Sequence, residues 1–120
     1  EKQFPDIADR VNVERLIAAQ KMIQSGRARG QLRTLIAEDR LFVGESDLAY
    51  AMSWAVTFYL AEKFPTEYLE LLRRDSQRPP FSIYQPDDRL NDFLDIFQVD
   101  LDRMEQDVHQ FVMELHLRRR

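Results

Sequence analysis

The chain has 120 residues, of which 44% are hydrophobic and 32% charged, as expected for one folded soluble domain with its own core. Its net charge of −4 argues against nucleic-acid binding, which needs clustered Lys and Arg, and the lack of cysteine excludes disulfides, zinc–thiolate sites and a thiol nucleophile. The longest uncharged run, residues 48–61, is too short to cross a bilayer, so no membrane insertion is predicted. We expect residues 1–120 to form a single helical domain. Because the first residue is Glu1 and not Met, we expect this domain to be a fragment of a larger protein.

Helical periodicity dominates the first half of the chain. We expect Asn12 to cap a helix that ends near Gln24. A turn at residues 25–30 then leads into a short helix at residues 31–38. Ser46 or Asp47 is expected to cap a central helix that ends near Lys63.

Prolines and caps define three further helices. Pro65 is expected at the first position of a helix ending near Arg74, and Pro86 opens the next one. Asp102 and Glu105 resemble a capping box for the last helix. The positions expected to face the core are Tyr68, Leu69 and Leu72 in the first of these helices; Leu90, Phe93, Leu94 and Phe97 in the second; and Leu101, Met104, Val108, Phe111, Val112 and Leu115 in the last. The pattern predicts an all-α bundle of five or six helices with short connections.

The central helix, at about residues 47–63, is apolar almost all the way round and is therefore expected to be buried between other layers. Its one polar and aromatic side, spanning about a quarter of the circumference, consists of Tyr50, Ser53, Trp54 and Thr57. The opposite side, which we expect to be core, consists of Leu48, Met52, Ala55 and Tyr59. The polar groups of the first side either bond to neighbouring helices within the domain or face another domain or a cleft.

Other candidate sites are incomplete. His109 and His116 lie two helical turns apart, roughly 10 Å along the axis, and so cannot chelate one ion. Glu105 and His109 could supply two metal ligands, but no third is evident. The sequence contains no G-x-S-x-G elbow, no glycine-rich phosphate loop and no H-E-x-x-H motif, so we expect no catalysis from this chain alone. An acidic stripe after Pro86, expected to be a solvated outer face, consists of Asp88, Asp92 and Asp95.

Short signatures follow one another along most of the chain. They are Phe4-Pro5-Asp6, Val11-Asn12, Arg15-Leu16, Leu32, Leu35-Ile36, Asp39, Ala49-Tyr50, Ser53-Trp54-Ala55, Tyr59-Leu60, Pro65, Tyr68-Leu69, Phe93, Phe97, Asp100-Leu101 and Glu105. In order and spacing they resemble the C-terminal helical part of a bacterial family of unknown function. That family carries a peptidase-MA-like, gluzincin-type metallopeptidase domain.

The resemblance implies a supporting role rather than catalysis. Gluzincins bind zinc through H-E-x-x-H and a downstream glutamate, which this chain lacks, so zinc is implied for the parent protein and no cofactor is expected here. The chain would then be a non-catalytic C-terminal subdomain that forms one wall of the cleft, with the missing N-terminal half of the same protein as its partner. By the same resemblance, Tyr50 is the candidate donor near the substrate. A secreted or periplasmic parent is compatible with the resemblance.

Two other interpretations stay open. The chain could be a stand-alone all-α interaction module, such as a homodimer, with an interface supplied by the aromatic residues Trp54, Phe58, Tyr59, Phe81 and Tyr84. A weaker alternative is a metal-dependent enzyme built on Glu105 and His109.

Overall fold

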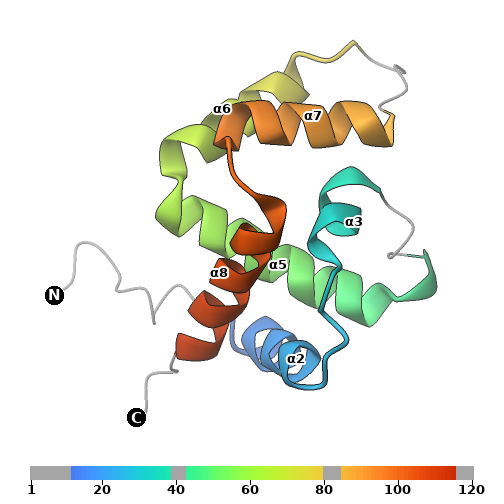
Figure 1. Cartoon of the computed structure of the whole chain (residues 1–120), viewed down its shortest axis with the longest axis vertical. Helices are drawn as coiled ribbons and strands as arrows, with labels where there is room; N and C mark the ends of the chain where they lie inside the picture. The colour runs from blue at the N-terminus through green and yellow to red at the C-terminus, as the bar shows by residue number, and fades with distance from the viewer. Residues whose placement is uncertain (1–11, 39–42, 80–84, 116–120) are drawn as a thin grey trace, which may run out of the picture.

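The computed structural model describes residues 12–38, 43–79 and 85–115, and within them it contains helices and no strand (Figure 1). Within these ranges the helices are α2 (Val13–Gln24), α3 (Leu32–Ala37), α5 (Ser46–Lys63), α6 (Pro65–Ser76), α7 (Pro86–Phe97) and α8 (Leu101–Glu114). The prediction of an all-α bundle is confirmed. None of the helices in these ranges is long and apolar enough to cross a membrane.

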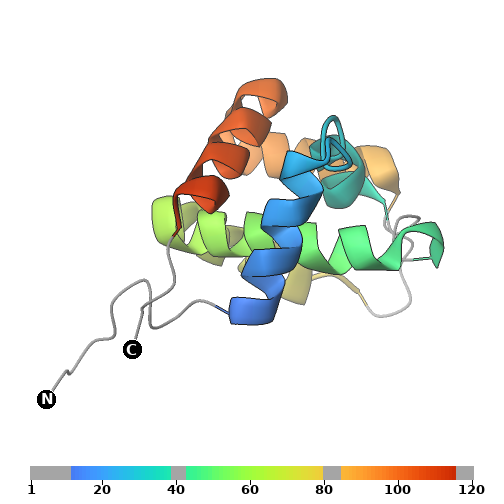
Figure 2. The same cartoon turned by 90° about the horizontal axis from the view of Figure 1, so that it is seen from below.

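Helix α5 runs through the middle of the molecule. It contacts α2, α3, α6 and α8, and α2 crosses directly over it in Figure 2. Its buried residues are Leu48, Ala49, Ala51, Met52, Ala55, Val56, Tyr59 and Leu60. The side predicted to be core is therefore buried, and it anchors the hydrophobic core that α2, α7 and α8 complete.

Local signals set most of the helix beginnings. The Asn12 side chain accepts a hydrogen bond from the Arg15 backbone N–H at 3.0 Å, as an N-cap does, and Pro65 and Pro86 open α6 and α7. At α5 the structure differs by one residue from the prediction. Its N-cap is Glu45, whose side chain makes no capping hydrogen bond, so neither Ser46 nor Asp47 holds that position.

The start of α8 corrects the predicted capping box. The N-cap is Asp100, whose carboxylate accepts from the Asp102 backbone N–H at 3.1 Å. Glu105 instead binds another part of the chain: its two oxygens accept from the backbone N–H groups of Gly30 and Leu32, each at 3.0 Å. A side chain of α8 thereby caps the beginning of α3.

The inward face of α6 also differs from the prediction. Leu69 and Leu72 are 66% and 45% exposed, so they lie at the surface of the described structure. Tyr68 packs against the core as predicted, Leu71 joins it in place of Leu69 and Leu72, and no residue of α6 is fully buried.

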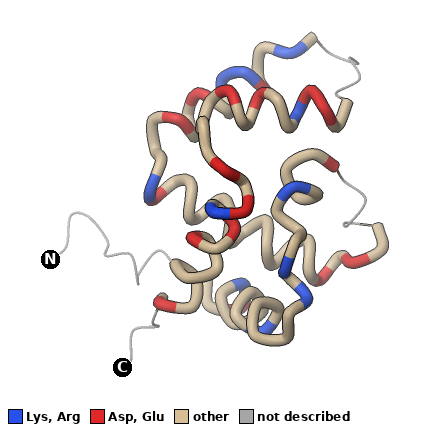
Figure 3. Tube along the Cα trace, in the orientation of Figure 1, with Lys and Arg blue, Asp and Glu red and all other residues tan. Residues whose placement is uncertain are grey.

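Ion pairs connect α6 to α7. Figure 3 shows acidic and basic positions gathered where these helices lie together. The Arg74 guanidinium nitrogens lie 3.0 Å from a carboxylate oxygen of Asp95 and 3.8 Å from one of Asp92. An Arg78 guanidinium nitrogen lies 3.0 Å from the other carboxylate oxygen of Asp92. Hydrogen bonds from Arg73 and Arg74 lower the pKa of Glu70 to about 2. At Asp92 and Asp95 the acidic stripe of α7 is therefore a contact face for Arg74 of α6 and for Arg78, which follows α6, and not simply a solvated face.

Candidate functional site

The polar and aromatic side of α5 lies at the surface of the described structure. Tyr50 is 52% exposed, Thr57 is also exposed, and Ser53 and Trp54 are partly buried. The sequence predicted that these four residues share one face, because the period of an α-helix is fixed. What this face contacts outside the chain stays a prediction.

This face lines a shallow outer hollow of about 400 Å³. The hollow is formed by Arg15 of α2 together with Tyr50, Ser53, Trp54, Thr57, Phe58 and Ala61 of α5. The Arg15 guanidinium carbon lies 5.4 Å from the centre of the Tyr50 ring, a cation–π arrangement. Trp54 stacks on Phe58 with ring centres 5.3 Å apart and an interplanar angle of 11°. The surface is thus aromatic, with hydroxyl groups and a single cation.

A chain of ring contacts connects this surface to the core. The ring centres of Phe58 and Phe111 are 5.9 Å apart. Those of Phe111 and Tyr59 are 5.5 Å apart, with the two rings edge-on. Tyr59 is only 7% exposed, so it belongs to the core and cannot supply the interface predicted for it. Phe81 and Tyr84, the other aromatic residues proposed for that interface, lie outside the described residues.

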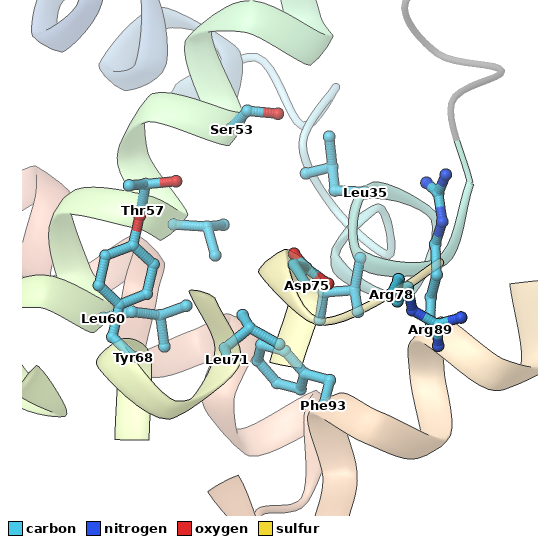
Figure 4. A pocket seen from close by; sticks show the side chains of 12 residues that line it. Leu35, Ser53, Thr57, Leu60, Tyr68, Leu71, Asp75, Arg78, Arg89 and Phe93 are labelled. Carbon is cyan, nitrogen blue, oxygen red and sulfur yellow. The ribbon is translucent and has the colours of Figure 1, made fainter. Parts of the chain in front are cut away.

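A second, inner hollow of about 490 Å³ lies between α3, α5, α6 and α7 (Figure 4). Its apolar lining consists of Leu35, Ile36, Val56, Leu60, Leu71 and Phe93, and its polar lining of Ser53, Thr57, Tyr68, Asp75, Arg78 and Arg89. Ser53 and Thr57 line both hollows, so the two meet along α5. The sequence did not predict this hollow, because its lining comes from four helices whose relative placement no local pattern specifies.

The Glu105 and His109 pair takes part in packing. Both oxygens of Glu105 accept backbone hydrogen bonds, as described above. Burial lowers the pKa of His109 below its ordinary value of 6.5, although the Glu105 carboxylate acts in the opposite direction. Among the described residues, no three His, Cys, Asp or Glu side chains cluster in a way that could hold a metal ion. His116 lies outside the described residues.

Comparison with known proteins gives one match. Residues 3–82 match the model of a family described as "Protein of unknown function (DUF1570)". The matched range includes α2, α3, α5 and α6, and so most residues of both hollows. No curated protein and no solved structure matches the chain.

Proposed function

The chain belongs to the DUF1570 family, and we propose that it acts as a non-catalytic helical subdomain of a larger zincin-like, gluzincin-type metallopeptidase, in which it forms one wall of the cleft. The ordered signatures that resemble the helical part following a peptidase-MA-like domain support this proposal. The partner of the subdomain is then the rest of the same protein, which carries the zinc ligands.

The observation that carries the proposal is the outer face of α5. A surface helix normally places charged residues on its solvent side. Here the outward positions from Tyr50 to Ala61 carry aromatic rings, hydroxyls and methyl groups but no charge of their own. Interface cores are enriched in aromatic residues and depleted of charge, so this face suits contact with another part of a protein.

Tyr50 is the residue of this face that we assign to the cleft. Its ring is half exposed, lies against the Arg15 guanidinium and lines the outer hollow. A phenol O–H directed at a peptide carbonyl would stabilise the negative charge that develops on its oxygen during hydrolysis.

A single-atom substitution tests this role. In the full-length parent protein, Tyr50→Phe is expected to lower peptide turnover about tenfold or more, because removing one oxyanion donor typically has an effect of that order or larger. Thermal stability should change little, since the ring and its contact with Arg15 remain. The matched control is Tyr59→Phe, on the buried side of the same helix, which should leave turnover unchanged. Equal turnover for Tyr50→Phe and the unsubstituted parent would remove the assigned role.

A second candidate function is a stand-alone interaction or dimerisation module. The exposed Leu69 and Leu72 on α6 favour it, because apolar side chains in a row on one helix are a common docking surface. Sedimentation of the isolated chain separates the candidates: a monomer at all accessible concentrations excludes the dimer.

A further inference from the structure

The inner hollow combines three kinds of chemistry. Its floor is apolar, with Leu60 and Phe93 buried and Leu71 partly buried beside them. Its volume, about 490 Å³, lies within the range of roughly 300–1,000 Å³ that is typical of small-ligand sites. A ligand that fills it therefore needs an apolar part.

Charges of both signs lie toward one end of this hollow. The Asp75 carboxylate accepts no hydrogen bond and forms no ion pair within residues 12–38, 43–79 and 85–115, and an ionised carboxylate can only accept. Arg78 and Arg89 lie close by in Figure 4. Arg78 already contacts Asp92 at 3.0 Å, but a guanidinium has five N–H donors and can bind a further anion. A ligand with one charge would meet a like charge here, whereas a zwitterion satisfies both signs.

Hydroxyl groups line the opposite side of the hollow. Ser53 and Thr57 from α5 and Tyr68 from α6 lie across from the arginines in Figure 4. Each hydroxyl can both donate and accept a hydrogen bond, which suits the N–H and C=O groups of an amide.

We propose that the inner hollow binds a short peptide that has free termini and a large apolar side chain. The peptide ammonium group pairs with Asp75, its carboxylate pairs with Arg89 and Arg78, and its apolar side chain lies over Leu71 and Phe93. The hydroxyls of the opposite side bind its amide group. This site needs no catalysis by the parent and shares only Ser53 and Thr57 with the outer hollow, so it stands independently of the proposed function.

Four forms of one dipeptide test the proposal. The complete 120-residue chain is titrated calorimetrically with leucyl-phenylalanine in its free, N-acetylated, C-amidated and doubly blocked forms. One molecule of the free dipeptide is expected per chain. Each single block should weaken binding about fivefold, the effect of losing one charge-assisted contact at a partly exposed site.

Two variants assign the charges to residues. Asp75→Asn should weaken binding of the free dipeptide about fivefold and abolish the effect of N-acetylation, while amidation keeps its effect. Arg89→Gln should do the reverse. Both should fold, because Asp75 lies near the C-terminus of α6 and Arg89 in the first turn of α7, where their charges oppose the helix dipoles. The matched controls, exposed and outside the lining, are Asp102→Asn and Arg33→Gln.

Three results would overturn the proposal: no binding at millimolar dipeptide, equal affinity for the free and doubly blocked forms, or an unchanged response to N-acetylation in Asp75→Asn. None of these touches the proposed function, because that is tested by the turnover of the parent with Tyr50→Phe.

Discussion

Glu105 shows how one side chain joins distant parts of this chain. Its carboxylate on α8 receives backbone hydrogen bonds from Gly30 and Leu32, more than 70 positions earlier in the sequence. Leu32 is the first residue of α3, and Gln31, the N-cap of that helix, makes no side-chain capping bond. A carboxylate is favourable at a helix N-terminus because the unpaired N–H groups there carry partial positive charge. The beginning of α3 therefore depends on a residue from the last helix.

Replacing this carboxylate should destabilise the whole fold. Glu105→Ala leaves two backbone N–H groups without their acceptor, and we expect a loss of about 1–2 kcal/mol in the free energy of unfolding. Urea denaturation followed by circular dichroism measures it. The control on the same helix is Glu114→Ala, since Glu114 is exposed and, among the described residues, accepts a hydrogen bond only from the Gln110 side chain one turn away. Similar losses for the two variants would contradict the capping role.

The same residue illustrates what local pattern can predict. An acidic residue at position 105, three after Asp102, matches a capping box in sequence, but Asp100 holds the cap in the structure. Sequence spacing correctly placed Tyr50, Ser53, Trp54 and Thr57 on one face, because a helix fixes that geometry by itself. It gave no sign of the inner hollow, since Asp75 and Arg89 meet only through the packing of separate helices.

At the scale of elements, small buried side chains on α5 allow the neighbouring helices to pack close to its backbone. Ala49, Ala51 and Ala55 are all 0% exposed, which means that helices pack against its backbone with only methyl groups between. Such positions have no room for a larger side chain, because protein interiors are packed as densely as organic crystals. The opposite case on the same helix is Ala61, which lies exposed at the edge of the outer hollow.

This contrast gives a prediction with its own control. Ala55→Leu should lower the free energy of unfolding by about 1–3 kcal/mol, the usual effect of overpacking a core. Ala61→Leu adds the same atoms to the same helix at an exposed site and should change stability by no more than about 0.5 kcal/mol. Thermal and urea denaturation of both variants provide the measurement. If both variants were equally stable, α5 would not be packed as described.

The predicted core faces of α5, α7 and α8 are confirmed, and the helix whose inward face was harder to predict than its beginning is α6. Asn12, Pro65 and Pro86 carry their signals locally, through a capping side chain or a fixed φ angle. In α6, by contrast, two sets of apolar positions have helical spacing, one with Leu69 and Leu72 and one with Leu71. In the second orientation Arg74 of α6 contacts Asp92 and Asp95 of α7, and these contacts cannot be predicted from the sequence of α6 alone.

Across the whole molecule, burial is distributed unevenly. Most of the fully buried side chains belong to α5 and α8, and both helices also contact α2. Helix α6 has no fully buried residue. Its Tyr68 and Leu71 are only partly buried against the core, and its ion pairs to α7, from Arg74 to Asp92 and Asp95, are partly exposed to solvent. Ion pairs of this kind contribute little to stability and are screened by salt. The molecule should therefore open first at α6.

Native-state hydrogen exchange tests this order of opening. Amides in the middle of α5 and α8 should exchange only through global unfolding, so their rates should follow the unfolding free energy in low urea. Amides in the middle of α6 should exchange faster and with little dependence on urea, because local opening exposes little surface. Raising the ionic strength should accelerate exchange in α6 and leave α5 almost unchanged, since ion pairs to α7 contribute to holding α6 whereas the contacts around α5 are apolar. Equal protection of α5 and α6 at every salt concentration would mean that the bundle unfolds as one unit and that the ion pairs between α6 and α7 are as strong as the core.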